Sequence, residues 1–125
     1  MSTILILGAR SDIAQAIAHR FAKEGFDLIL AARPCDEQSD LAHDLAIRHG
    51  VTAQAVEFDA LDYASHERFV QGMEPLPEVT ACVFGYLGDQ ERARHEFQEA
   101  ERILTTNFVG AVSILNHIAD ACESR

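Results

Sequence analysis

The sequence has few basic residues, few cysteines and no long apolar run. Its 10 lysines and arginines stand against 20 aspartates and glutamates, which gives a formal net charge of -10 at pH 7. Nucleic-acid-binding proteins usually carry a basic patch, and anionic membrane surfaces also attract basic segments. The charge balance therefore argues against both kinds of partner, and it is typical of a solvated surface.

Other absences narrow the chemistry. No apolar run approaches the roughly 18 residues of a membrane-spanning helix, and the apolar start lacks the basic region and the length of a signal peptide. The cysteines Cys35, Cys82 and Cys122 are odd in number and widely spaced, and the six histidines form no metal-ligand pair. We expect no metal, no nucleic acid, no membrane and a reducing cytoplasmic environment.

What the sequence does contain is a regular alternation of short apolar runs and helical patterns. With 125 residues, 48% of them hydrophobic, one domain with a real core is expected. The apolar runs predict strands and the periodic stretches predict helices. The strands are expected at 3–7, 26–32, 51–58 and 79–84, and the helices at 12–24, 36–49, 62–73 and 97–122.

This order predicts an α/β fold. Strands that alternate with helices form parallel sheets with right-handed crossovers. We expect a Rossmann-like, doubly wound parallel sheet in the order 3-2-1-4, ending after about four strands.

The first strand is followed by Gly8-Ala9-Arg10-Ser11-Asp12-Ile13-Ala14. A turn between a strand and a helix is where phosphate groups bind, because backbone N–H groups and the helix dipole favour an anion there. The alternative is an ordinary turn in which Asp12 is the helix N-cap.

The ends of the next two strands carry charged residues that suit a dinucleotide. The second strand ends with Ala32-Arg33, so the carboxylate that would bind the 2′-OH of NAD is absent, whereas Arg33 can pair with the 2′-phosphate of NADP. Arg10 can assist from the preceding turn. Asp59, after the third strand, can accept a hydrogen bond from an adenine amino group. Solvated surface arginines and a helix-capping Asp59 are the alternatives.

Together these motifs resemble the short-chain dehydrogenase/reductase family. Its glycine turn reads Thr-Gly-x-x-x-Gly-x-Gly, and here Leu7, Asp12 and Ala14 replace the Thr and the later glycines. The resemblance implies cofactor contacts at Gly8, Arg10, Ser11, Asp12, Ile13, Arg33, Asp59, Ala60 and Gly85. Of the family's Asn-Asn-Ala-Gly segment only Gly85 remains.

Asn107-x-x-Gly110 resembles the family's Asn-x-x-Gly, which would make Asn107 the catalytic-tetrad residue that holds a water in a proton relay. The family's Tyr-x-x-x-Lys pair is missing: Tyr63 and Tyr86 have no lysine four residues later, and Lys23 is the sole lysine. Without that pair the acid–base step has no carrier. The resemblance thus covers only the family's N-terminal half, and we expect the isolated chain to be inactive.

The residues around Phe84-Gly85-Tyr86-Leu87-Gly88-Asp89 also resemble a bacterial branch that includes decaprenylphosphoryl keto-sugar 2-reductases. The leading interpretation is an NADP-preferring portion of an oxidoreductase that transfers hydride between carbonyl and alcohol. A non-enzymatic NADPH-binding module and a purely structural module are the alternatives.

We expect a homodimer or larger assembly, because the fourth strand and the last helix would leave apolar surface uncovered. Asp40, Asp44, Glu91, Glu96 and Glu99 are expected on solvated faces.

Overall fold

The computed structural model describes residues 2–33 and 35–124. The chain forms two compact units. One consists of the residues up to Asp59 together with Pro75–Phe84, and the other consists of Ala60–Glu74 together with the chain from Gly85 onward. The first unit contains the sheet, and the second is helical.

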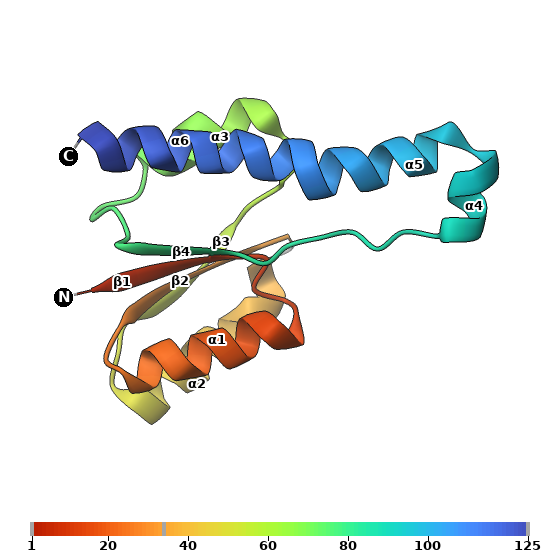
Figure 1. Ribbon diagram of the computed structural model, residues 1–125. Helices are drawn as coiled ribbons and strands as arrows, with labels where there is room; N and C mark the ends of the chain where they lie inside the picture. The colour runs from red at the N-terminus through yellow and green to blue at the C-terminus, as the bar shows by residue number, and fades with distance from the viewer. Residues whose placement is uncertain (1, 34, 125) are drawn as a thin grey trace. The chain divides into compact units, whose positions relative to one another are not determined.

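The sheet has four parallel strands, β1 (Thr3–Leu7), β2 (Asp27–Ala32), β3 (Ala53–Glu57) and β4 (Val79–Cys82). Their order is β3-β2-β1-β4, as the alternation of strands and helices predicted (Figure 1). The α/β, Rossmann-like fold class is therefore confirmed. Because parallel strands run in the same direction, the turns after β1, β2 and β3 leave the sheet at one edge, where ligands bind in open α/β sheets.

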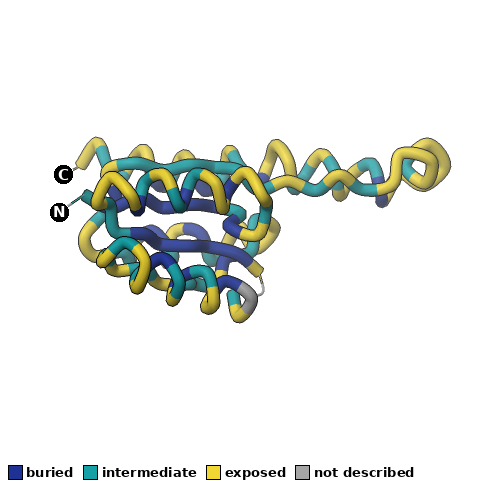
Figure 2. Tube along the Cα trace, turned by 90° about the horizontal axis from the view of Figure 1, so that it is seen from below, coloured by how far each residue is buried: buried dark blue, intermediate teal, exposed yellow. Residues whose placement is uncertain are grey.

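The core of the first unit lies around the two inner strands. Every residue of β1 is buried, and so are the last five of β2, which explains their continuous apolar sequences (Figure 2). Helices α1 (Asp12–Lys23) and α2 (Ser39–His49) lie on the same face of this sheet (Figure 1). Helix α1 buries only alanines, namely Ala14, Ala18 and Ala22. These small side chains permit close packing on the strands.

One large apolar side chain of α1 is exposed. Ile13, which the family resemblance places among the cofactor contacts, is 68% exposed. The buried stripe runs through the alanines, four residues apart, and Ile13 lies beside that stripe.

The second unit contains α3 (Tyr63–Gln71), α4 (Gln90–His95), α5 (Phe97–Leu104), the π-helical turn η2 (Thr105–Val109) and α6 (Gly110–Ser124). The last three form one continuous rod (Figure 1). Helix α3 packs against α6, where the buried His66 ring lies 2.7 Å from the Ser113 hydroxyl. Gly110 makes close packing possible, because a Cβ atom there would lie 2.8 Å from the carbonyl oxygen of Ala60.

Several predicted boundaries differ from the structure. The third and fourth strands are shorter than expected, and the second helix begins with a 3₁₀ turn, η1 (Cys35–Gln38). Helix α4 was not predicted, because its sequence Gln-Glu-Arg-Ala-Arg-His has no apolar period. The single long helix expected over 97–122 is interrupted by η2, in which the Gly110 N–H donates to the Thr105 carbonyl five residues earlier.

Candidate nucleotide-binding site

The turn after β1 is held by backbone hydrogen bonds and requires glycine at its start. The N–H groups of Gly8 and Ala9 both donate to the Ala31 carbonyl, at 2.8 and 3.1 Å. Gly8 has φ = 95°, and a Cβ atom there would lie 2.5 Å from the backbone of Phe84. No other residue type fits this position without displacing Phe84.

The start of α1 is capped by Ser11. The Ser11 hydroxyl accepts a hydrogen bond from the Ala14 N–H at 3.1 Å, so the proposal that Asp12 is the N-cap was wrong. Asp12 is instead the first residue of the helix, and its side chain is exposed. Adjacent Ser and Asp are equally good caps, and the position of the first helical residue decides between them. A carboxylate in the first turn interacts favourably with the helix dipole, but it competes with a phosphate group for the same position.

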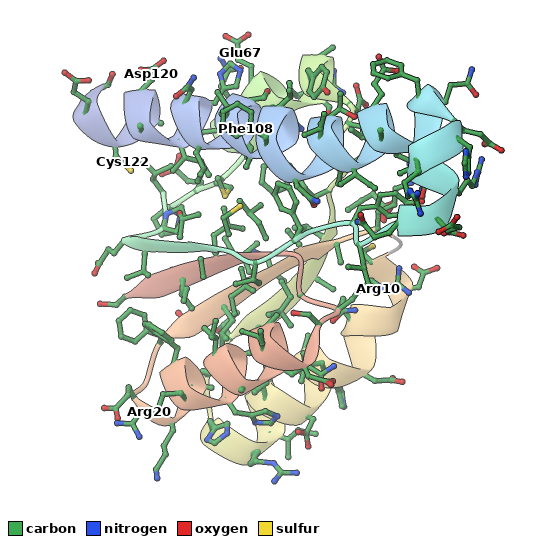
Figure 3. The ribbon with its side chains drawn as sticks, turned by 45° about the vertical axis from the view of Figure 1, so that its right-hand side comes forward. Arg10, Arg20, Glu67, Phe108, Asp120 and Cys122 are labelled. Atoms are coloured by element: carbon green, nitrogen blue, oxygen red, sulfur yellow. The ribbon has the colours of Figure 1, made fainter. Side chains whose placement is uncertain are left out.

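Two arginines and an aspartate come together at the ends of β2 and β3. The Arg33 Nη1 atom lies 2.7 Å from the Asp59 Oδ2 atom in an ion pair. The Arg10 Nη1 atom donates to the Arg33 carbonyl at 3.0 Å, which places its guanidinium at the same edge (Figure 3). The Arg33 side chain remains 66% exposed. Arg10 and Arg33, expected at the 2′-phosphate, are therefore neighbours of Asp59, expected at the adenine amino group.

A further contact at this edge was not found from the sequence. The Glu57 carboxylate accepts a hydrogen bond from the Cys35 N–H at 2.8 Å and so ties the end of β3 to the residues after β2. Burial, and next the Glu57 carboxylate, raise the pKa of the Cys35 thiol. The thiol is therefore protonated at neutral pH and is a poor nucleophile.

The second group of predicted residues lies in the helical unit. Asn107, in the turn η2, makes two hydrogen bonds to the backbone of Tyr86: its Oδ1 atom accepts from the Tyr86 N–H at 2.6 Å, and its Nδ2 atom donates to the Tyr86 carbonyl at 2.9 Å. A Cβ atom on Gly85 would lie 3.2 Å from the same Oδ1 atom. The Asn107 side-chain amide thus pairs with the Tyr86 backbone as the backbone of an adjacent strand would.

The water-holding role expected of Asn107 stays a prediction. In the structure its side-chain amide is hydrogen-bonded to the Tyr86 backbone, and the residue lies in a π-helical turn. Such π-helical turns are frequent at functional sites. Ala60, the remaining predicted contact, has its carbonyl oxygen and methyl group packed against Gly110.

Glu99 was expected on a solvated face, and this prediction was wrong. The residue is 3% exposed, and its carboxylate accepts hydrogen bonds from the Tyr86 hydroxyl at 2.8 and 3.1 Å and from the Asp89 N–H at 2.8 Å. These bonds, first of all the one from Asp89, lower the pKa of Glu99. The same carboxylate raises the pKa of Tyr86.

Among residues 2–33 and 35–124, no cluster of three or more histidine, cysteine, aspartate or glutamate side chains is arranged to hold a metal ion. Over the same residues, no helix has the length and apolar character needed to cross a membrane.

Comparison with known proteins agrees with the geometry. The family model described as short chain dehydrogenase matches residues 2–125. An uncharacterized oxidoreductase of Mycobacterium tuberculosis is 39% identical over 124 residues, which is 97% of this chain and 49% of the relative. The serine 3-dehydrogenase of Agrobacterium fabrum is 28% identical over 93% of this chain and 47% of its own length. The chain spans about half the length of the curated relatives it matches.

Solved structures show the same architecture. A short-chain dehydrogenase from Sphingobium yanoikuyae in complex with NADPH superposes with a TM-score of 0.80 at 26% identity, covering 97% of this chain and 48% of the other. An alcohol dehydrogenase from the archaeon Thermococcus sibiricus complexed with 5-hydroxy-NADP superposes with a TM-score of 0.79 at 27% identity, covering 96% and 52%.

Proposed function

We propose that this chain, which belongs to the short-chain dehydrogenase family, is the NADP-binding portion of an oxidoreductase that transfers hydride between a carbonyl and an alcohol. The observation that carries the cofactor preference is the convergence of Arg10 and Arg33 at the end of β2. Two solved relatives were crystallised with NADPH or a derivative of NADP.

The 2′-phosphate of NADP would bind Arg33. Guanidinium groups pair with phosphate through two parallel hydrogen bonds, and such charge-assisted bonds are strong. Because the Arg33–Asp59 pair is largely exposed, it contributes only about 0–1 kcal/mol and is easily exchanged for a phosphate. The Asp59 carboxylate would then accept a hydrogen bond from the adenine amino group.

The pyrophosphate would bind over the turn that begins at Gly8. The helix that starts after Ser11 presents its N-terminal N–H groups and dipole to an anion there. Asp12 opposes this binding by its charge, so we expect an affinity in the micromolar range rather than tighter.

The test is a fluorescence titration of NADPH with the unchanged chain, Arg33→Ala and Arg48→Ala. Arg48 is an exposed arginine of the same unit that pairs with Asp44 and is the matched control. Loss of hydrogen bonds to a charged group costs about 1.5–3 kcal/mol, so Arg33→Ala should weaken NADPH binding about 10- to 100-fold. NADH binding should not change. Equal losses in both arginine variants would overturn the assignment of Arg33.

Catalysis is a separate question, because the chain contains no Tyr-x-x-x-Lys pair. We propose that the isolated chain turns over no carbonyl substrate. NADPH oxidation by the purified chain, abolished in Asn107→Ala, would contradict this.

A structural module without cofactor is the second candidate. It is favoured by the pairing of Arg33 with Asp59, which offsets both charges without a ligand, and by the loss of two of the family's three glycines. Absence of binding by any dinucleotide in the titration would support it.

We also propose that the chain assembles into a homodimer or larger oligomer. The rod formed by α5, η2 and α6 exposes the large apolar side chains of Leu104, Phe108, Val112 and Leu115, and Figure 3 marks Phe108 on it. Exposed apolar surface of this kind favours association. Light scattering at moderate concentration should show more than a monomer, and Phe108→Glu should shift the population to monomer.

A further inference from the structure

The segment that follows β4 has no regular secondary structure, and yet side chains from later in the chain hold it at two residues, Tyr86 and Asp89. Residues 83–89 belong to no helix or strand. Asn107 binds the backbone of Tyr86 from one side, as described above. The Tyr86 hydroxyl and the Asp89 N–H both reach the carboxylate of Glu99.

Glu99 is unusual among the acidic residues of this chain because it is buried. Removing a carboxylate from water is costly unless hydrogen bonds and positive charge compensate for it. Here the compensation comes from the segment itself and from Arg92, whose Nη1 atom lies 4.0 Å from Glu99 Oε1. Glu99 also lies in the first turn of α5, where the helix dipole favours negative charge.

The fit around this carboxylate is close. A Cβ atom on Gly88, which has φ = 68°, would lie 2.8 Å from Glu99 Oε2 and 2.7 Å from the side chain of Ile103. The Arg102 guanidinium stacks over the Tyr86 ring at 4.2 Å from its centre. The segment therefore lies directly on Glu99 and cannot shift without breaking several contacts at once.

We propose that Glu99 is the positioning residue of the segment from Gly85 to Asp89, and that its carboxylate preorganises this segment for cofactor binding. The proposal rests on the proposed function, because Gly85 is one of the predicted cofactor contacts. Glu99 acts on the segment through Tyr86 and Asp89, so its effect on binding is indirect. Preorganisation strengthens binding by removing the cost of ordering a segment at the moment of binding.

Tyrosine fluorescence and absorbance report on this arrangement directly. The chain has two tyrosines and no tryptophan, so Tyr63→Phe leaves Tyr86 as the single emitting residue. A phenol hydrogen-bonded to a carboxylate has quenched emission and ionises at higher pH than a free phenol. The quenching and the higher ionisation pH should both disappear in Glu99→Ala. Both should be partly retained in Glu99→Gln, whose amide oxygen still accepts one hydrogen bond.

The experiment combines that signature with NADPH titrations of Glu99→Ala, Glu99→Gln and Glu96→Gln. Glu96 is exposed, lies between α4 and α5, pairs with Arg92 of α4 and is the matched control. We expect Glu99→Ala to restore ordinary Tyr86 emission and weaken NADPH binding about 5- to 50-fold, Glu99→Gln to lie between, and Glu96→Gln to match the unchanged chain. Gly88→Ala, which displaces the carboxylate without removing it, should act like Glu99→Ala.

The outcomes separate the two proposals. If Arg33→Ala loses NADPH while Glu99→Ala binds as the unchanged chain does, the inference is overturned and the proposed function stands. If the unchanged chain binds no NADPH, the proposed function is wrong. The cofactor part of the inference then falls as well. The positioning role of Glu99 is decided by Tyr86 emission and by the amide hydrogen exchange of Asp89, and unchanged values in Glu99→Ala would overturn it.

Discussion

Two segments that follow strands of the same sheet are held in opposite ways. The turn after β1 is held by backbone hydrogen bonds, because the N–H groups of Gly8 and Ala9 both donate to the Ala31 carbonyl of the neighbouring strand β2. The segment after β4 is held by side chains that come from far along the sequence, Asn107 and Glu99. A turn of the first kind depends on backbone conformation at one position, whereas a segment of the second kind depends on the identity and charge of its partners.

This difference indicates which residue substitutions each segment tolerates. The first turn has lost two family glycines and still forms, because the backbone bonds do not involve those side chains. The second segment has lost most of the Asn-Asn-Ala-Gly sequence and is fixed instead by a buried carboxylate and an amide. Substitutions at Gly8, Asn107, Glu99 and Ser11 test this contrast.

Gly8→Ala should have the largest effect. It combines a positive φ, which costs an L-residue about 1–2 kcal/mol, with a Cβ atom 2.5 Å from the Phe84 backbone, a clash that costs about 1–3 kcal/mol more. We expect a loss of about 3 kcal/mol or more in the free energy of unfolding, measured by urea denaturation and far-ultraviolet circular dichroism.

Gly25→Ala is the control for Gly8→Ala. Gly25 has φ = 89°, but a Cβ atom there meets nothing within 4 Å. Its loss should stay near the conformational cost alone. Equal losses at the two positions would mean that the close approach to Phe84 contributes nothing.

Asn107→Leu should have the next largest effect. It removes both hydrogen bonds to the Tyr86 backbone, each of which contributes about 0.5–1.5 kcal/mol. Asn107→Asp keeps the acceptor and loses the donor, so its loss should be smaller at neutral pH. Asn116→Leu, on the exposed side of α6, is the control. Hydrogen exchange of the Tyr86 amide measures the local effect, and unchanged protection in Asn107→Leu would show that the segment is held without this residue.

Acidification should release the second segment before the first turn. The pKa of Glu99 is lowered in the folded state, chiefly by the Asp89 N–H and then by the Tyr86 hydroxyl, with Arg92 and Arg102 acting in the same direction. A lowered pKa contributes stability that is present above the ordinary glutamate value of about 4.3 and is lost as the pH falls through the folded value.

In hydrogen-exchange measurements between pH 7 and pH 3, referenced to the intrinsic exchange rate at each pH, the Asp89 amide should therefore lose protection in the acidic range. In Glu99→Gln its protection should vary little over that range. A parallel loss at Gly8 would show that both segments depend on the carboxylate.

The sequence predicts the first unit far better than the second. The strand order follows from the alternation of short apolar runs and helical patterns, which are local signals. The contacts of Asn107 and Glu99 join residues 10 to 21 positions apart, through a segment without periodicity, and no local pattern marks them. Burial of Glu99 was missed for this reason, because it sits among exposed acids of similar spacing.

The choice between Ser11 and Asp12 as the cap of α1 was also beyond local patterns, and it leads to the smallest predicted effect. Ser11→Ala removes the bond to the Ala14 N–H and should cost about 1 kcal/mol in the free energy of unfolding. Asp62→Ala is the matched control, because Asp62 occupies the N-cap position of α3 but makes no capping hydrogen bond through its side chain. Asp62→Ala should therefore cost less than Ser11→Ala. A larger loss at Asp62 would mean that the position in the sequence, rather than the hydrogen bond seen at Ser11, sets the strength of a cap in this fold.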